Sequence, residues 1–502
     1  MRRVDHGASF ASDSFGVSGG NIIPTNAVAY GYLLDTLKAD PQPWLKESPE
    51  IIEGLTKLGE TMRSAGDESS PSDVPAAYTY FGQFVDHDLT MMDFPRPPGE
   101  PASCDFTNPK FGPLSDLSAI TNQRASFLQL DVLYNGLPPR SDGRMVLGVT
   151  TRTDSPILCK DQFNDVPRSE SHDDKHLDRV ALIGDPRNDN NLIVSQMHVA
   201  FLRAHNSLIT RGYLLADAKK ILRQHYHWVL IHDFLKRIAD PAIVEDVLTR
   251  SDPLCDPDAP GFCLPVEFTG AAYRFGHSMV RTTYYFNERL PGISFGGLIP
   301  IMFMVQANTP TLPDTRIIQW ELFVGDPDVP NSNFARRMST TLNTPLFSVR
   351  DANGEPLKCE IKLAVMDLLR GYMLKLPTGQ AIARELNARG RKVAILTPKQ
   401  IEDVAANSEQ RDLLRDPAFE FSERTPLWFY ILAEAAYFAQ GNHLGPVGST
   451  IVAEVLIALV RRSPDPILPK AGESFGDKGF VPFKTPSGDF RLVDLLRLGK
   501  VL

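Results

Sequence analysis

The chain has 502 residues, of which 42% are hydrophobic and 23% are charged, and its formal net charge at pH 7 is −9. A chain of this length and composition can bury a large core and belongs with the globular proteins. The negative charge gives no reason to expect binding to nucleic acid or to anionic lipid. No apolar run approaches the roughly 20 residues that would span a membrane, so we expect no membrane span.

The cysteines and the N-terminus bear on the compartment. The sequence has an odd number of cysteines without CxxC spacing, namely Cys104, Cys159, Cys255, Cys263 and Cys359. This usage does not indicate a disulfide framework, and it fits a reducing compartment. No apolar stretch follows the first residues, so we expect no signal peptide and a cytoplasmic location; secretion by a non-classical route stays open.

Residues 1–70 are predicted to be an N-terminal arm and a surface helix packed on the body of the protein. Residues 1–30 are rich in Gly, Ser and Asn, which predicts an extended arm. Ser48–Arg63 has a proline at its start and apolar residues at helical spacing, which predicts the surface helix.

Residues 71–502 are predicted to form one large domain, because no convincing linker or internal repeat interrupts them. Phe94–Gly112 is expected to be loop, and turns dominate residues 138–179, with a short hairpin expected near Met145–Ile157. The remaining patterns predict helices at Tyr78–Leu89, Leu192–Tyr213, Leu215–Ile238, Phe268–Thr282, Ile361–Tyr372, Gly379–Ala388, Pro426–Tyr437 and Gly448–Arg462. The fold class is therefore mainly α, a single large helical domain with little β structure.

The predicted helix Tyr78–Leu89 carries the most informative group of polar residues. Gln83 and His87 are four residues apart and project from one face of that helix. A neutral imidazole near an amide, flanked by the carboxylates of Asp86 and Asp88, can move a proton beside a bound cofactor. The alternative is a satisfied histidine at a helix end with two solvated aspartates.

The second informative segment is the loop Gly184–Asn191, which leads into the predicted helix at Leu192. Arg187 follows Pro186 and stands just before the helix start, where backbone donors and a fixed cation together favour an anion. The alternative is an ordinary turn and cap.

The third segment, Ala271–Ser278, places Gly276 directly before His277. A glycine at this position removes a side chain where something flat and bulky could approach. The alternative is a close helix crossing at Gly276.

These three segments together resemble the animal-type haem peroxidase superfamily, which contains myeloperoxidase, lactoperoxidase, peroxinectins and, more distantly, cyclooxygenases. The resemblance extends from about Pro71 to about Leu468, and the chain is similar to a short, bacterial-type member that consists of the peroxidase domain alone. Further segments that carry it are Asp165–Arg168, Met197–Asn206, Arg370–Pro377 and Leu444–Ser449.

The resemblance implies a haem peroxidase with haem b as its cofactor. It implies that His277 is the proximal ligand of the haem iron and that His87 is the distal proton carrier. Arg187 would stabilise charge on the separating O–O bond, and Gln83 would position a distal water or a small anion. Hydrogen peroxide would react through an oxoferryl intermediate, with small organic or (pseudo)halide molecules as reducing substrates.

On the proximal side, the resemblance implies that Asp367 accepts a hydrogen bond from His277, where relatives usually have Asn. A carboxylate accepts more strongly, so the imidazole should gain anionic character and the iron reduction potential should fall. Arg370 and Arg274 would pair with haem propionates. The alternative for Asp367 is an N-cap or a surface carboxylate.

Covalent attachment of haem is expected through at most one ester. The resemblance places the first esterifying carboxylate at Asp86. The second falls at Asn190, which cannot form an ester, and Asn191 stands where myeloperoxidase has its sulfonium-forming methionine.

The resemblance also implies a calcium site, in which Asp88 joins a loop that spans residues 125–131. Asp131 and backbone carbonyls near Phe127 could supply the oxygen ligands that calcium prefers. Gln129 stands where relatives have Asp, and Ala125 where they have Thr. The lost charge and hydroxyl should weaken calcium binding.

Two other functions are alternatives to a peroxidase. Fatty-acid dioxygenases of the cyclooxygenase or diol-synthase type carry a radical-forming tyrosine three residues before the proximal histidine. Arg274 takes that place here, and Tyr273 is one residue off, a rotation of about 100° on an α-helix. A non-catalytic haem-binding protein would not need His87, Arg187 and Gln83, so a peroxidase is favoured.

One histidine cluster resembles a zinc site superficially. His225 and His232 are seven residues apart and would share a helix face, but His227 points about 160° away from it. Zinc-binding helices prefer pairs four residues apart. We therefore expect these three histidines to be core and capping residues.

Overall fold

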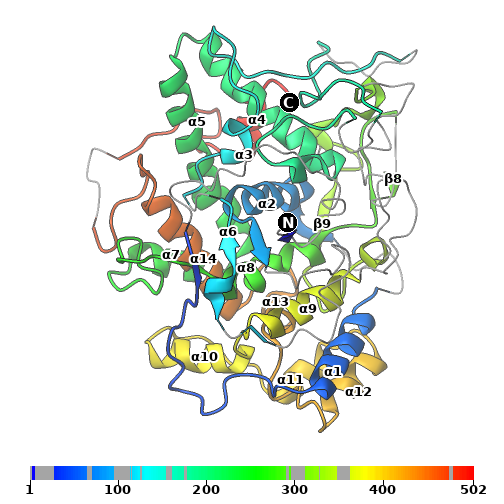
Figure 1. Ribbon diagram of the computed structural model, residues 1–502, viewed down its shortest axis with the longest axis vertical. Helices are drawn as coiled ribbons and strands as arrows, with labels where there is room; N and C mark the ends of the chain where they lie inside the picture. Colours follow the sequence, from blue (N-terminus) through cyan, green and yellow to red (C-terminus); the bar gives the residue numbers. More distant parts are fainter. Residues whose placement is uncertain are drawn as a thin grey trace.

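The computed structural model describes residues 3–5, 28–64, 71–94, 113–114, 116–124, 127–153, 161–173, 178–289, 293–294, 311–326, 328–347, 362–473 and 479–502. Helices dominate this part of the chain and the strands are short (Figure 1). The predicted mainly α fold is therefore confirmed.

The α-helices of these residues are α1 (Pro49–Thr61), α2 (Ala76–Leu89), α3 (Asp131–Tyr134), α4 (Leu192–Thr210), α5 (Leu215–Val229), α6 (Leu235–Ile238), α7 (Pro241–Thr249), α8 (Val266–Gly270), α9 (Leu363–Met373), α10 (Gly379–Ala388), α11 (Pro398–Asp403), α12 (Ser408–Arg415), α13 (Leu427–Ala439), α14 (Pro446–Arg461) and α15 (Leu492–Leu498). The 3₁₀ segments used below are η4 (Pro186–Asp189) and η6 (Ala272–Met279), and a π-helical turn, η5 (Leu230–Phe234), joins α5 to α6.

The strands of the described residues form one three-stranded sheet and three two-stranded pairs. They are β1 (Arg3–Asp5), β2 (Tyr30–Gly31), β3 (Pro71–Pro75), β4 (Met92–Phe94), β5 (Thr121–Asn122), β6 (Leu264–Pro265), β7 (Thr283–Tyr284), β8 (Ile293–Ser294) and β9 (Phe334–Arg336). Their order is β1-β4-β5 in one antiparallel sheet, with the antiparallel pairs β3-β9 and β7-β8 and the parallel pair β2-β6.

Helix α2 runs through the middle of the molecule, with α4 packed along it (Figure 1). Aromatic rings fill the contact: Phe84 of α2 stacks on Phe201 of α4 with ring centroids 4.4 Å apart. Tyr226 of α5 meets both rings edge-on. Such aromatic pairs stabilise the fold beyond the free energy gained from area burial alone. The contact therefore fixes α2, the helix that carries His87, against α4 and α5.

Most predicted helices are confirmed, and one is wrong. The predicted helix Phe268–Thr282 is split: α8 ends at Gly270, and the chain continues as the 3₁₀ segment η6. Ala271 has φ −140° and ψ −66°, which no helix adopts. Gly270 also lies against Leu374, where a Cβ would come within 2.6 Å of its side chain. Glycine is a poor helix former, and this close approach requires it at the break.

The N-terminal part meets the body at several places. Strand β1 pairs with β4, β2 pairs with β6, and α1 packs on α9. Ser48 caps α1 by accepting a hydrogen bond from the backbone of Ile51. Three predicted segments lie wholly or partly outside the described residues. They are the remainder of the predicted arm, the part of the Phe94–Gly112 loop that follows Phe94, and residues 154–157 of the predicted hairpin. The described part of that hairpin has one antiparallel bridge, Gly148 to Asp165.

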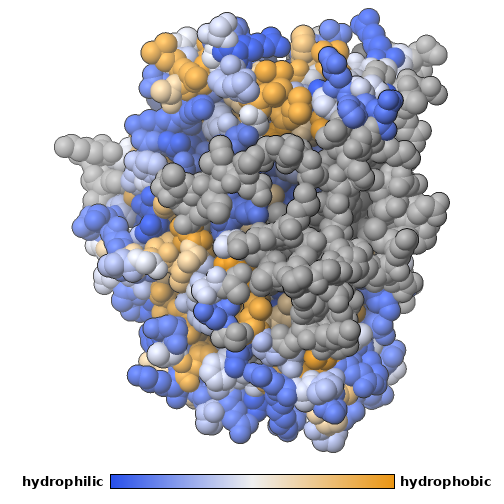
Figure 2. Space-filling model, in the orientation of Figure 1, coloured by the Kyte–Doolittle hydropathy of each residue, from blue (hydrophilic) through white to orange (hydrophobic). Residues whose placement is uncertain are grey.

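The surface is mixed in character. On the face shown, hydrophilic residues predominate at the end of the molecule that α1 and α10–α12 form (Figure 2). Among the residues that the structure describes, none of the helices combines the length and apolar character needed to cross a bilayer.

Candidate active site

One cavity lies between α2, the start of α4 and η6, which are far apart in the sequence. Its empty volume, including the open mouth, is about 880 Å³, within the roughly 300–1,000 Å³ typical of small-molecule and cofactor sites. The predicted site residues that line it are Gln83, Asp86, His87, Arg274 and His277. The predicted residues behind its wall are Arg187, Asp367 and Arg370.

His87 lies in the last turn of α2 and is 4% exposed. Its Nδ1–H donates to the Oδ1 atom of Asn188, 2.7 Å away. Burial, followed by the nearby charge of Arg187, lowers the pKa of His87 to about 4, against a smaller opposing effect of Asp185. The imidazole is therefore neutral at pH 7 and can accept a proton in the cavity that it lines.

Asn188 connects two buried imidazoles. Its Nδ2 group donates to the Nδ1 atom of His198 in α4, 3.0 Å away, while its Oδ1 atom accepts from His87. Burial lowers the pKa of His198 to about 3, so this ring is also neutral. The amide thus holds the His87 ring in one orientation. Sequence reasoning missed both residues, although an isolated imidazole within the apolar start of α4 was a usable signal.

Arg187 is buried behind His87. Its Nε atom donates to both carboxylate oxygens of Asp185, at 2.9 and 3.0 Å. Its Nη2 atom donates to the backbone carbonyls of His87 and Thr90, at 3.1 and 2.7 Å. Asp185 also pairs with Arg124. Arg187 therefore stabilises the C-terminal end of α2, where a cation is favoured, and it adds positive charge beside the His87 ring.

The Asp185 side chain caps η4 by accepting from the backbone N–H of Arg187 at 2.9 Å. The turn-and-cap interpretation of this loop is thus correct for Asp185. The interpretation of Arg187 as a fixed cation is compatible with this cap, because the Asp185 carboxylate that caps η4 also holds the Arg187 guanidinium. Burial opposes ionisation of Asp185, but Arg124 and Arg187 outweigh it and hold its pKa well below the ordinary value.

Gln83 lies one turn before His87 on the cavity face of α2. Its Oε1 atom accepts from the Nδ2 group of Asn191, 3.0 Å away. Asp86, a further lining residue, accepts at Oδ1 from the hydroxyl of Thr90 at 3.2 Å. Gln83 and His87 thus meet the cavity from one face of α2, as their spacing predicted, and Asp86 lines the cavity with them.

His277 faces the same cavity from η6. Its Nδ1–H donates to Asp367, 2.6 Å away. The other ring nitrogen, Nε2, is therefore the one that can bind a group in the cavity. Gly276 also lines the cavity, and a Cβ placed there would meet nothing within 4 Å among the described residues. The close-crossing interpretation of Gly276 is therefore wrong, since open space and not a neighbouring helix lies beside it.

Asp367 is fully buried in the second turn of α9. It accepts from Arg370 at 2.8 Å and contacts Arg274 at 3.4 Å. Burial raises its pKa, but His277, Arg274 and Arg370 outweigh this effect and keep the pKa below the ordinary value. The residue that caps α9 is Lys362, so neither the N-cap nor the surface interpretation of Asp367 holds.

Arg370 and Arg274 differ in position. Arg370 has no exposed surface, and its side chain bonds to Asp367. Arg274 lines the cavity, and its Nε atom donates to the backbone carbonyl of Thr269 at 2.8 Å. Of the two, Arg274 is the cation that reaches the cavity, whereas Arg370 orients the carboxylate behind His277.

Residues 135–371 match the family model of the animal haem peroxidases. The chain contains an animal haem peroxidase domain. The matched segment carries Arg187, His277 and Asp367, and α2 with His87 precedes it along the chain. The two sides of the cavity thus come from inside and outside the matched segment.

A peroxidase-like protein from Margaritifera margaritifera is 27% identical to this chain in an alignment of 254 residues, and the match covers 41% of this chain and 32% of that protein. The match thus covers about a third of the length of this curated relative.

Solved structures share the fold at low sequence identity. Peroxidase A from Dictyostelium discoideum has a TM-score of 0.58 and 15% identity, covering 94% of this chain and 98% of that one. Fatty acid alpha-dioxygenase from Arabidopsis thaliana has a TM-score of 0.54 and 12% identity, covering 91% and 74%. The Oryza sativa enzyme with palmitic acid has a TM-score of 0.52 and 14% identity, covering 84% and 75%. At these identities the likeness establishes the fold alone.

The cavity of the peroxidase domain fits the haem that the family implies. Space is open beside Gly276, and the imidazole of His277 is oriented through its far nitrogen by a carboxylate, as metal-ligating histidines usually are. Much of the wall is apolar, which suits a flat hydrophobic macrocycle: Phe234, Phe275, Met279, Val280, Leu346 and Leu363.

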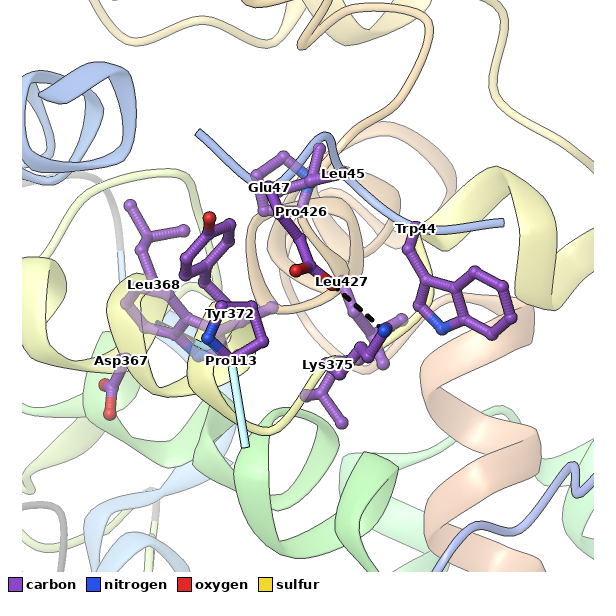
Figure 3. A pocket seen from close by; sticks show the side chains of 13 residues that line it. Trp44, Leu45, Glu47, Pro113, Asp367, Leu368, Tyr372, Lys375, Pro426 and Leu427 are labelled. Carbon is purple, nitrogen blue, oxygen red and sulfur yellow. Dashed lines mark ion pairs between the residues drawn. The ribbon is translucent and has the colours of Figure 1, made fainter. Parts of the chain in front are cut away.

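A smaller pocket lies on the other side of Asp367 (Figure 3). An ion pair of 3.0 Å joins Lys375 to Glu47 there, and Trp44 lies beside Lys375. The indole of Trp428 also lines this pocket and donates to the backbone carbonyl of Arg274 at 3.3 Å. Trp428 and the apolar side chains of this pocket thus pack behind η6, the segment that carries His277.

The predicted calcium ligands are only partly brought together. Asp88 accepts hydrogen bonds from the backbone N–H groups of Leu130 and Val132, at 3.0 and 3.4 Å. Burial, and then the nearby charge of Asp131, raises the pKa of Asp88 to about 7. Within the described residues, which omit 125–126, no three acidic, His or Cys side chains form a group that could hold a metal.

The other two predicted calcium ligands have different surroundings. The ring of Phe127 lies 5.4 Å from the guanidinium carbon of Arg462, and Gln129 is half-buried. The carbonyl of Leu128 accepts from Nε2 of His227 at 2.8 Å. A cation at this loop would compete with donors that already serve Asp88 and Leu128.

The histidine cluster is structural in its contacts. His225 donates through Nδ1 to the carbonyl of Ile221 at 2.8 Å, and its Nε2 accepts from the backbone of Phe483 at 2.9 Å. His232 packs on Trp228 with ring centroids 4.0 Å apart. With His227 bonded to Leu128, each ring has a packing or hydrogen-bond partner of its own, as expected for core and capping residues.

Proposed function

We propose that this protein is a haem peroxidase that reduces hydrogen peroxide and oxidises small organic or (pseudo)halide donors. The observation that carries this proposal is that His87 and His277 line one cavity from two separate elements. Each imidazole is oriented through Nδ1 by a buried partner, Asn188 for His87 and Asp367 for His277. One ring can therefore hold a metal while the other handles a proton.

On the proximal side, His277 would bind the iron of haem b. When bound, haem supplies an iron with an open face at which the O–O bond of peroxide is cleaved. The hydrogen bond to Asp367 fixes the tautomer of His277 and increases its basicity. Arg274, on the cavity wall, is the residue that we assign to a propionate, and Arg370 holds Asp367 in place.

On the distal side, His87 would accept the first proton of hydrogen peroxide and return it to the departing oxygen. Its pKa of about 4 means that the ring is neutral and ready to accept a proton at pH 7. The hydrogen bond from Nδ1 to Asn188 leaves Nε2 of His87 as the nitrogen that would accept this proton. The positive charge of Arg187 would favour negative charge near this ring. Because Arg187 lies behind the cavity wall, its other contribution would be to hold the end of α2 in place through the carbonyls of His87 and Thr90.

Reconstitution with haem b followed by rapid mixing with hydrogen peroxide tests the proposal. A peroxidase gives a fast Soret change and turns over one or more of bromide, iodide, thiocyanate and a phenol. A haem-binding protein without catalysis gives slow bleaching and no turnover. His277→Ala should lose haem or its peroxidase spectrum, and a normal Soret band with full activity in that variant would sink the assignment.

A second candidate, oxygenation of a fatty acid, is favoured by one observation. Tyr273 lines the cavity, and its buried hydroxyl has no hydrogen-bond partner among the described residues. On an α-helix Tyr273 would be rotated away from the position of a radical-forming tyrosine, but η6 is a 3₁₀ segment with a different angular step per residue. Tyr273→Phe should abolish oxygenation of palmitate if this candidate holds, and it should leave peroxide turnover intact.

We also propose that Asp86 can form a single ester with haem, because it lines the cavity while the second position is the amide of Asn190. Calcium binding remains a proposal that rests on Asp88 and Asp131. It requires a cation to replace the backbone donors of Leu130 and Val132 at Asp88.

A further inference from the structure

We propose that residues 480–490 form a strap that the neutral ring of His225 fastens to α5, and that this strap opens when the ring takes up a proton. The strap leads into α15, which begins at Leu492. His225 belongs to the histidine cluster of α5 and η5, and the proposed peroxidase chemistry leaves it without a role. The inference therefore concerns a conformational switch outside that chemistry.

Backbone groups fix the protonation state of both His225 nitrogens. Nδ1 lies 2.8 Å from the carbonyl oxygen of Ile221, and a carbonyl can only accept, so Nδ1 must carry a hydrogen. Nε2 lies 2.9 Å from the backbone nitrogen of Phe483, whose N–H can only donate, so Nε2 must be the lone pair. A protonated imidazole has two donors and no acceptor. It therefore cannot keep the bond to Phe483.

The surroundings of the ring also oppose a positive charge. His225 is 1% exposed. The rings of Phe480, Phe483 and Phe490 lie around it, with centroids 5.2, 4.3 and 4.6 Å from the imidazole. Burial lowers the pKa of His225 to about 4, and the hydrogen bond to Ile221 opposes this shift only in part. An imidazolium under the closed strap would face three apolar rings and the N–H group of Phe483.

The charged groups near the ring give protonation no support. The guanidinium carbon of Arg211, at the end of α4, lies 5.3 Å from the centre of the Phe483 ring. After burial, the positive charge of Arg211 is a further cause that lowers the pKa of His225. The charged residues of the strap itself, Lys484 and Asp489, are exposed.

His232 is a second histidine near the strap. Burial and then Lys236 lower its pKa to about 4, whereas the charge of Asp489 in the strap opposes this shift. A proton on His232 would therefore be attracted by the strap. We assign the opening to His225, because its Nε2 atom bonds to the strap directly and loses that bond on protonation.

The strap can open without unfolding the body of the protein. Its turn is held by bonds of its own: the backbone N–H of Gly488 donates to the carbonyl of Thr485 at 3.1 Å, and the Thr485 hydroxyl donates to the carbonyl of Asp489 at 2.9 Å. Beyond the strap, the backbone of Leu492 donates to Asp233 at 2.9 Å and fixes the start of α15. The opening should therefore end before α15, as a local opening of low free energy does.

The direction and size of the pH effect follow from proton uptake. In the open strap the pKa of His225 returns to its ordinary value of 6.5, whereas the closed strap holds it at about 4. Between these values the open form holds a proton that the closed form lacks. Closure is therefore fully favoured above about pH 6.5 and weakens as pH falls toward 4. From about pH 8 to about pH 5, the ratio of open to closed strap should rise about thirtyfold.

Hydrogen exchange with mass spectrometry measures this ratio, as the protection of backbone amides relative to their intrinsic exchange rate at each pH. Protection of residues 480–490 should fall about thirtyfold from about pH 8 to about pH 5, while α5 should change little. His225→Gln keeps an acceptor for Phe483 but does not titrate, so its strap should lose at most about threefold. His225→Phe keeps a ring without an acceptor, so its strap should be less protected at both pH values and insensitive to pH.

His227→Gln is the matched control, because His227 is also buried in α5 and burial lowers its pKa to about 4 as well. Its Nε2–H donates to the carbonyl of Leu128 at 2.8 Å, a bond that protonation leaves intact. This variant should therefore keep the pH response of the wild-type strap.

Three results would overturn the inference. The first is a wild-type change below about threefold, a tenth of the expected rise. The second is a wild-type response that persists in His225→Gln or in His225→Phe; if His225→Gln does not fold, His225→Phe decides alone. The third is a loss of protection in α5 that follows the strap at each pH, because that would be a general loosening of the fold. A response confined to the strap, absent from both His225 variants and retained in His227→Gln, supports the switch.

Discussion

The Nδ1 atom of His277 lies 2.6 Å from a carboxylate oxygen of Asp367, and this bond joins η6 to α9 across the proximal wall. Asp367 has no exposed surface and is held by Arg370 at 2.8 Å. Because the carboxylate is fixed from behind, the imidazole has one tautomer and one orientation. The bond thus orients His277 for the metal-ligand role that we propose for it.

Asp367→Asn tests how the charge of this carboxylate acts on the site. An amide accepts the His277 hydrogen bond more weakly, so the iron reduction potential should rise, and the reaction with peroxide should slow by about 10- to 100-fold, the usual range for such partners. Spectroelectrochemistry and stopped-flow absorbance measure the two effects. Met366→Leu, on the same helix, is the control, and a potential equal to that of wild type would contradict the assignment.

His87→Ala should slow the reaction with peroxide by about 10²- to 10⁴-fold, the range for removing a proton carrier. Haem binding should be retained, since His87 and His277 line the cavity from two separate elements, α2 and η6. Rapid mixing over a series of peroxide concentrations gives the rate constant. Traces that match wild type would assign the proton transfer to another group.

Asn188→Ala removes the acceptor of the His87 Nδ1–H, so the ring can rotate or change tautomer. We expect a loss of about tenfold or more in the peroxide reaction, smaller than the loss in His87→Ala, with an altered dependence of the rate on pH. Asn188→Asp restores an acceptor and should recover part of the rate. Equal rates in Asn188→Ala and wild type would remove Asn188 from the site.

Much of the site was predictable because helical spacing fixes direction. Gln83 and His87 are four residues apart, and both line the cavity from α2. The partners Asn188 and His198 could not be predicted, since their contacts depend on how η4 and α4 pack against α2. Spacing within one helix is local information, whereas hydrogen bonds between elements depend on tertiary packing.

The proximal segment shows where local patterns mislead. Residues 268–282 have apolar residues at helical spacing, yet Ala271 breaks the helix and η6 follows with 3₁₀ geometry. This break carries Tyr273 to the cavity, a position that α-helical geometry did not predict. The burial of Arg187 is equally hard to predict, because the sequence indicates its partner Asp185 only as part of a turn.

Glu434 should make folding stability depend on pH. It is fully buried in α13, and its oxygens accept from the backbone of Val447 and Gly448 at 2.9 and 3.1 Å. Burial raises its pKa from 4.5 to about 8. Between these values the folded protein holds a proton that the unfolded chain has released, so this group makes stability fall as pH rises from about 4.5 to about 8.

Glu434→Gln removes that titration and should flatten the pH dependence. The free energy of unfolding in urea, measured from pH 5 to 8, should fall less steeply in the variant than in wild type. Glu423→Gln changes an exposed carboxylate near α13 and should leave the slope unchanged. Parallel profiles for Glu434→Gln and wild type would show that Glu434 does not titrate in this range.

Haem linkage distinguishes Asp86 from Asn190, the two cavity-wall residues at the positions that the resemblance assigns to ester bonds. After turnover with peroxide we expect haem joined through a single ester at Asp86, with some haem left free if oxidation is incomplete. Asp86→Asn should release all haem on denaturing chromatography with mass detection. Asn190→Glu adds a carboxylate at the second position and should permit a second bond if the distance allows. Haem that is entirely free after turnover, or doubly attached in wild type, would contradict the single-ester prediction, because only one of the two positions carries a carboxylate.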